Sequence, residues 1–174
     1  MMKSLKKTYE MYQIKVHGFV LMGNHFHLIC ETPEGNLDDV MQLFLKTSSH
    51  LINLSSGKSP PTWESRYRWS LIENRGHYYQ VYRYIFQNPL RAKIVDKVEN
   101  YPFSSFNSEL PVPIHSTLSI AMGGREGEMR WLNQKFNSEV QEIIKKGLKH
   151  ALFDINKKKA RLIDRLEVPE DFDS

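Results

Sequence analysis

Residues 13–30 read QIKVHGFVLMGNHFHLIC and contain two apolar runs on either side of a Gly-Asn pair. The first run is rich in β-branched and aromatic residues, which favour strands. Gly23-Asn24 is a turn signal, and the second run, from His25 to Cys30, continues the extended pattern. The stretch therefore predicts a β-hairpin, or one long strand kinked at Gly23.

The second run contains the triplet His25-Phe26-His27. Residues two apart on a strand point to the same face. Both imidazoles are therefore expected to project together, while Phe26 turns into the core. Two neighbouring imidazoles on one rigid strand form half of a divalent-metal site. The triplet alone leaves a second interpretation open, in which one histidine is a structural residue with a satisfied hydrogen bond.

The segments around the hairpin are predicted to be largely helical. A lysine-rich helix ends near residue 12, and a second helix begins after Asn36, a plausible N-cap followed by two aspartates that suit the helix dipole. Apolar residues recur at helical spacing up to residue 52, and the Ser, Gly and Pro residues of 55–61 end this helix. Residues 63–72 alternate aromatic and charged side chains and are predicted to contain a strand.

A further helix is predicted from His77 to Asn88, stopped by Pro89. Its expected buried stripe consists of Tyr78, Val81, Tyr82 and Ile85. Tyr84 and Asn88 lie four residues apart and share the other, more polar flank. Tyr84 could serve as a nucleophile if a nearby cation or base activates it, since a phenol ordinarily has a pKa near 10; it could equally be a packing residue. Asn88 could cap the helix end or supply an oxygen ligand.

The C-terminal half divides into two regions. Residues 107–127 are poor in periodic pattern and contain prolines and a Gly-Gly pair, which predicts a linker. Residues 128–166 are predicted to be helical and rich in lysine, and the acidic end, 167–174, is expected to fray. The expected organisation is a domain over 1–106, a linker, and a C-terminal helical extension over 128–174.

Composition constrains the class of protein. The chain has 174 residues, 40% hydrophobic and 25% charged, which is ordinary for a soluble globular protein. Its net charge of +4 permits an anionic partner without requiring one. Cys30 is the single cysteine, so an intramolecular disulfide is excluded. The sequence has neither a signal-peptide pattern nor an apolar run long enough to span a membrane, and a cytoplasmic protein is expected.

Four motifs in order resemble a known family, the HUH single-tyrosine transposases. FVLMGNHFHLI (19–29) resembles their metal-binding strand, and YIFQNPLRA (84–92) is similar to the tyrosine-helix motif of their REP-associated branch. WESRY (63–67) lies between these two motifs and YPFSSF (101–106) follows them, as in the family. The resemblance covers residues 13–106, and four ordered motifs are more specific than any one of them.

The resemblance implies an α/β (α+β) fold. It is expected to be an antiparallel sheet of ferredoxin-like or RRM-like topology, with helices on one face, the histidines on the exposed face, and a C-terminal helical extension. It also implies a site in which His25, His27 and Asn88 bind Mg²⁺ or Mn²⁺. Tyr84 would attack a DNA phosphate and leave a 5′-phosphotyrosine link and a free 3′-OH, the chemistry of an endonuclease and strand transferase.

The implied substrate is single-stranded DNA beside a hairpin, for transposition and recombination. The candidate DNA-binding residues are Arg66, Arg68, Arg83, Arg91 and Lys93. Each could instead be an ordinary surface charge. Monomer and homodimer both remain open, because in related enzymes a dimer can place the tyrosine of one chain beside the histidines of the other.

The sequence departs from the family pattern at two places. Gly23 stands where the family usually has proline, and only about a dozen residues precede Gln13, where the family carries a further N-terminal strand. Without that strand, the sheet beside the histidine strand should have an unpaired edge. The chain could be a truncated copy, another segment or subunit could fill the place, or the sequence could begin late.

These departures leave three hypotheses for function. The first is an active transposase with nuclease and strand-transferase activity. The second is a catalytically silent remnant that still binds single-stranded DNA. The third is a small metal-stabilised or purely structural protein.

Overall fold

A short antiparallel hairpin lies at the centre of the molecule. The computed structural model describes residues 1–57, 63, 66–116, 118–134, 137–153 and 155. Strand β1 (Lys15–Leu21) pairs with β2 (Phe26–Glu31), and Val20 lies opposite His27. The turn closes where the Met22 backbone N–H donates to the His25 carbonyl at 2.8 Å. Of the two predicted forms, the hairpin is the one found.

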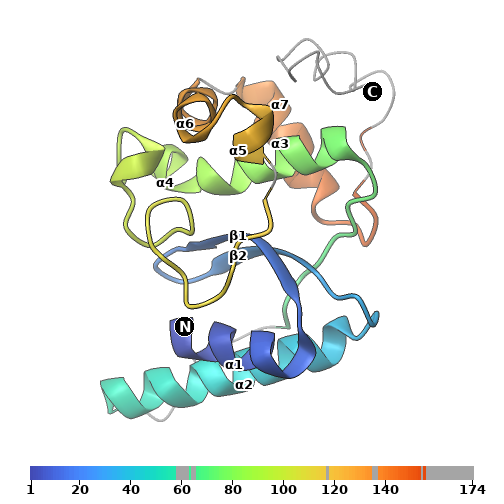
Figure 1. Ribbon diagram of the computed structural model, residues 1–174, viewed down its shortest axis with the longest axis vertical. Helices are drawn as coiled ribbons and strands as arrows, with labels where there is room; N and C mark the ends of the chain where they lie inside the picture. The colour runs from blue at the N-terminus through green and yellow to red at the C-terminus, as the bar shows by residue number, and fades with distance from the viewer. Residues whose placement is uncertain (58–62, 64–65, 117, 135–136, 154, 156–174) are drawn as a thin grey trace.

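Helices cover both faces of this hairpin (Figure 1). On one side lie α1 (Met2–Tyr12) and α2 (Leu37–Ser56). On the other lies α3 (Arg75–Phe86), continued by the short α4 (Asn88–Arg91). The remaining elements are η1 (Val98–Asn100), a single 3₁₀ turn, and a group of helices beyond α3: α5 (Leu118–Ala121), α6 (Arg125–Asn133) and α7 (Ser138–Gly147).

The two-sided arrangement follows from β1, which is apolar on both faces. Phe19 is buried in a core with α1 and α2, whereas Val20 is buried in a second core with α3. A strand that buries both faces needs cover on both. The predicted class, a mixed α and β fold with an antiparallel sheet and a helical C-terminal region, is confirmed. The sequence predicted helices on one face of the sheet, whereas in the structure they pack on both faces.

The helix α2 begins as the sequence predicts, directly after Asn36, and it ends at Gly57, whose φ of 65° suits a glycine. The strand predicted within 63–72 is wrong for the described residues of that segment. Leu71 alone forms a bridge there, to Leu152. Leu71 is 53% exposed, so this segment lies at the surface rather than inside a sheet.

The outer edge of β1 is occupied by a later part of the chain. The Leu21 N–H donates to the Phe103 carbonyl, and the Ser105 N–H to the Phe19 carbonyl, each at 2.8 Å. Further along, the His115 N–H donates to the Val16 carbonyl at 2.8 Å. Within the described residues β2 pairs only with β1. The edge expected to lack a partner is therefore the outer edge of β2.

Much of the predicted linker packs against the rest of the molecule. Val112 is buried in the core beneath α1 and α2, and Leu118, which begins α5, is buried in the core around α3. In the described part of the predicted C-terminal helical region lie α6, which begins at Arg125 within the predicted linker, and α7. Residues 156–174, which include the acidic end, lie outside the described part of the chain. In the described part, none of the helices combines the length and apolar character needed to cross a membrane.

Candidate metal and tyrosine site

The two histidines lie side by side at the turn of the hairpin. His25 directly precedes β2 and His27 is the second residue of the strand. Their ring centroids are 5.0 Å apart and the rings are nearly perpendicular. The His25 Nδ1 is hydrogen-bonded to the Asn24 side-chain oxygen at 2.8 Å, so Nδ1 carries the proton. This bond leaves the Nε2 lone pair of His25 available to a ligand.

His27 has the properties of an unsatisfied metal ligand. Its Nε2 is buried and has no hydrogen-bond partner within the described chain. Burial, together with the neighbouring charges of His25 and Arg91, lowers the pKa of His27 to about 4. The imidazole is therefore neutral near physiological pH, which is the form that binds metals. Since a buried polar atom normally has a partner, a metal ion at this nitrogen fits the residues present.

Tyr84 lies on α3, above His27. The two ring centroids are 6.4 Å apart, and only 7% of Tyr84 is exposed. The helix can approach the hairpin this closely because β1 carries Gly18 at the contact. A Cβ built at Gly18 would lie 3.1 Å from Phe86 Cε2 and 3.4 Å from Ile85 Cδ1, both on α3. The absence of a side chain at Gly18 thus places the tyrosine over the histidine pair.

Asn88 is held at the junction between α3 and α4. Its side-chain nitrogen donates to the carbonyls of Tyr84 and Ile85, each at 3.2 Å, which satisfies two carbonyls at the end of α3. The helix α3 ends at Phe86, two residues before the predicted end, because the chain must accommodate Pro89, which lies in the first turn of α4. The Asn88 oxygen accepts a hydrogen bond from Arg91.

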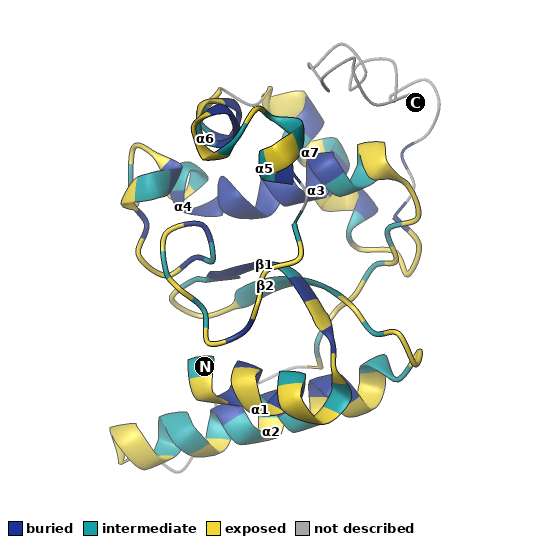
Figure 2. Ribbon diagram, in the orientation of Figure 1, coloured by how far each residue is buried: buried dark blue, intermediate teal, exposed yellow. Residues whose placement is uncertain are grey.

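The expected polar flank of α3 is buried instead. Gln80 is 1% exposed, and all residues from Tyr79 to Phe86 are buried (Figure 2). The pattern on α3 predicted one apolar stripe, but α5, α6 and α7 cover the side opposite the hairpin (Figure 1). Tyr84 is therefore both a packing residue and a candidate nucleophile, two interpretations that the sequence set against each other.

The five candidate DNA-binding cations fall in three environments. Arg66, Arg68 and Lys93 are exposed. Arg91 is half-buried, and its guanidinium carbon lies 3.9 Å from the centroid of the Tyr84 ring. Arg83 is buried, donates to the Gln134 carbonyl at 2.8 Å and lies over the Trp131 ring. Its contacts are with α6 and the residue that follows it, which turns its charge away from solvent.

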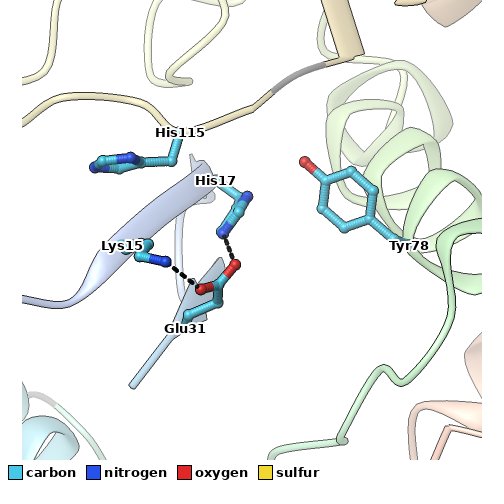
Figure 3. Close-up of a pocket in the computed structure, with 5 residues that line it drawn as sticks. All are labelled: Lys15, His17, Glu31, Tyr78 and His115. Atoms are coloured by element: carbon cyan, nitrogen blue, oxygen red, sulfur yellow. Dashed lines mark hydrogen bonds and ion pairs between the residues drawn. The ribbon is translucent and has the colours of Figure 1, made fainter. Parts of the chain in front are cut away.

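A second polar cluster, which sequence reasoning missed, lies at the other end of the hairpin (Figure 3). The cluster lines a pocket and consists of Lys15, His17, Glu31, Tyr78 and His115. The Glu31 carboxylate accepts from Lys15 Nζ at 3.0 Å and contacts His17 Nε2 at 2.9 Å. Burial nevertheless lowers the pKa of His17, against the effect of Glu31. The sequence signal that could have indicated this cluster is the pair of polar residues Lys15 and His17 in β1, together with Glu31 at the end of β2.

Where the structure describes the chain, neither of the two clusters brings three His, Cys, Asp or Glu side chains together as a conventional metal site requires. In the portion of the chain with described placement, no three or more His, Cys, Asp or Glu side chains are grouped to hold a metal ion. The pocket of His17, Glu31 and His115 is therefore not a metal centre of that kind. Among the described residues, a third ligand for the pair His25 and His27 would have to be of another type, and the Asn88 side-chain oxygen is a suitable one.

Comparison with known proteins identifies the family of the chain. The family model described as IS200-like transposase matches residues 1–88, just over half of the chain. The chain belongs to the IS200-like transposase family. It is similar to the REP-associated tyrosine transposase of Escherichia coli (strain K12), with 26% identity over 96 residues, which covers 55% of this chain and 56% of that protein.

A second relative extends the similarity further along the chain. The putative REP-associated tyrosine transposase of Haemophilus influenzae (strain ATCC 51907 / DSM 11121 / KW20 / Rd) is 23% identical over 121 residues, which covers 63% of this chain and 69% of that protein. The chain thus spans a little over half of the first relative and about two thirds of the second. No solved structure gives a significant match.

Proposed function

We propose that this protein is a transposase that cuts and rejoins single-stranded DNA through a covalent link to Tyr84, with Mg²⁺ or Mn²⁺ held by His25, His27 and Asn88. The observation that carries the proposal is the proximity of the rings of His25, His27 and Tyr84. The His25 and His27 rings are 5.0 Å apart, and the His27 and Tyr84 rings 6.4 Å apart, within one chain. This proximity favours a tyrosine and histidines that act in the same protomer, and a homodimer is not required.

The chemistry follows from the residues. The Tyr84 oxygen attacks the phosphorus in line, its bond to phosphorus forms, and the bond from phosphorus to the 3′ oxygen breaks. The phenol loses its proton to solvent, and the departing 3′ oxygen takes one up. When bound, the divalent metal would offset charge that develops on the phosphate oxygens. Because the phosphotyrosine keeps a phosphodiester, a second 3′-OH can reverse the step and join strands.

The DNA grip is proposed to come from exposed cations. Arg66, Arg68 and Lys93 are exposed and can neutralise backbone phosphates, which makes affinity depend on salt. Arg83 is left out of this set because its guanidinium is buried against α6. The proposed substrate is a single strand beside a hairpin.

Covalent capture tests the proposal. The protein is mixed with 5′-labelled and 3′-labelled hairpin oligonucleotides that carry single-stranded flanks of random sequence, in Mg²⁺ or Mn²⁺. The 3′ label should stay with the protein on denaturing gels, because the proposed link joins Tyr84 to the 5′-phosphate of the downstream fragment. This captured label should be lost in Tyr84→Phe. Tyr79→Phe is the matched control, since it makes the same change on the same helix, and it should retain capture.

A silent DNA-binding remnant is the second candidate, favoured by the burial of Tyr84. It gives salt-sensitive binding of the same oligonucleotides without a covalent product in either metal. If there is neither capture nor binding at moderate salt, both DNA functions are wrong and a structural role remains.

A further inference from the structure

Arg91 contacts two members of the proposed site at once. Its guanidinium carbon lies 3.9 Å from the Tyr84 ring centroid, and one of its nitrogens donates to the side-chain oxygen of Asn88. Arg91 ends α4, three residues after Asn88, so both side chains are on the same short helix. Its positive charge also acts on His27 across the site. A cation of the protein itself therefore lies among the groups proposed to hold a metal cation.

The orientation of the Asn88 amide determines which of its atoms faces Arg91. The nitrogen is fixed by the Tyr84 and Ile85 carbonyls, which can only accept hydrogen bonds. Turning the amide over would place its oxygen against those two carbonyls and its N–H groups against the guanidinium. The oxygen must therefore face Arg91. That oxygen is the side-chain atom of Asn88 able to bind a divalent ion, and the Arg91 guanidinium already lies against it.

We propose that Arg91 is a positioning residue that acts as a latch: in the DNA-free protein it occupies the Asn88 oxygen and covers Tyr84, and it transfers to a DNA phosphate when the substrate binds. The inference rests on the proposed function. A phosphate is a stronger partner than an amide oxygen for guanidinium, because it carries charge and accepts two parallel hydrogen bonds. The transfer frees the Asn88 oxygen for the metal and uncovers the tyrosine at the same moment.

The latch has a functional consequence. Until DNA arrives, the protein groups of the proposed site that are open to a metal ion are the two imidazoles of His25 and His27, because Arg91 lies against the Asn88 oxygen. The third ligand becomes available when a phosphate has drawn Arg91 away. The metal site is therefore completed by substrate, so that Tyr84 and a fully coordinated ion are not present together without DNA.

Mn²⁺ binding to the full chain without DNA tests the latch, with free Mn²⁺ measured by electron paramagnetic resonance. Arg91→Gln removes the competitor for the Asn88 oxygen, and we expect it to bind Mn²⁺ roughly tenfold more tightly than the natural protein, the scale of one charge-assisted hydrogen bond. Arg91→Lys keeps the charge but not the planar fork, and should give a smaller gain. Lys97→Gln, which removes an exposed charge elsewhere, should leave the affinity unchanged.

The Asn88→Ala background separates a latch from simple charge repulsion. If Arg91 acts through the Asn88 oxygen, the gain from Arg91→Gln disappears when that oxygen is absent. A gain that persists in Asn88→Ala overturns the latch, as does the absence of any gain in the single variant. Loss of Mn²⁺ binding in His27→Ala confirms that the measured ion is at this site. If neither the natural protein nor Arg91→Gln binds Mn²⁺ at all, the proposed metal site itself fails.

Covalent capture supplies a second readout that a purely structural role would not produce. The latch predicts that Arg91→Gln captures less DNA while binding Mn²⁺ more tightly, because the guanidinium no longer grips the phosphate. Parallel loss of metal affinity and capture would instead indicate that Arg91 only maintains the fold, and would overturn the proposal.

Discussion

Replacement of Gly18 by alanine should loosen the contact that places Tyr84 over the histidines. The new Cβ would lie 3.1 Å from Phe86 Cε2, inside the ordinary carbon–carbon separation of about 3.5–4.0 Å, and would be in van der Waals contact with Ile85 Cδ1 at 3.4 Å. Overpacking a core costs about 1–3 kcal/mol. Loss of glycine freedom in the unfolded chain returns about 0.4–1 kcal/mol. The free energy of unfolding should therefore fall by about 1–2 kcal/mol.

Urea denaturation of Gly18→Ala, followed by circular dichroism, measures this change. Gly23→Ala is the matched control, since a Cβ there meets no described atom within 4 Å and the residue lies in the hairpin turn. That variant should change the free energy of unfolding by no more than about 0.5 kcal/mol. If Gly18→Ala is as stable as Gly23→Ala, the close packing of α3 on the hairpin is not what positions Tyr84, and this reasoning is refuted.

Three further predictions concern charged residues, both buried and exposed. Burial raises the pKa of Glu128, which accepts from the Tyr82 hydroxyl at 2.7 Å, so the stability it contributes is present at low pH and is lost as pH rises from its ordinary value of 4.5 through the raised one. Glu128→Gln, neutral at every pH, should therefore gain in melting temperature over the natural protein as pH rises across this range; parallel melting curves would contradict this. Arg66→Gln and Arg68→Gln should each lower by about one the slope of log affinity for single-stranded DNA against log salt. Arg83→Gln should leave that slope unchanged but lower the free energy of unfolding by about 1–3 kcal/mol, and a reduced slope in Arg83→Gln would show that its guanidinium reaches DNA after all.

The local patterns of the sequence predicted two extended runs with a turn signal between them, and left open whether they form a hairpin or one kinked strand. The period of two along a strand predicted that His25 and His27 lie together. The start of α2 after Asn36 also lies where the local pattern predicts it, although the Asn36 side chain forms no capping hydrogen bond. These features depend on residues only a few positions apart, so no knowledge of tertiary contacts was needed.

The burial of α3 could not be predicted in the same way. Its polar residues Gln80 and Arg83 are both buried, and the Arg83 guanidinium donates to the carbonyl of Gln134, which lies about 50 residues later in the chain. The bridging of β1 by residues 103–105 and 114–115 is equally non-local. Helical spacing reports which residues share a face, but not how many faces the rest of the chain will cover.

The engagement of Asn88 by Arg91 was also beyond sequence reasoning. Spacing placed Asn88 and Tyr84 on one face, and the resemblance implied a ligand role for the amide oxygen. The short α4 that carries both Asn88 and Arg91 appears only in the structure, because it depends on how the chain turns at Pro89. Arg91, which was predicted to bind DNA, thus packs against the ring of Tyr84, the proposed nucleophile.

The most direct test of the account is to locate the covalent bond between protein and DNA. The protein is incubated with a hairpin oligonucleotide in Mn²⁺, digested with nuclease and protease, and the peptides are analysed by mass spectrometry. The account predicts a nucleotide attached through its 5′-phosphate to the peptide that contains Tyr84, and no adduct in Tyr84→Phe. An adduct on another tyrosine, or DNA cleavage that persists in Tyr84→Phe, would contradict the assignment of Tyr84 as the nucleophile.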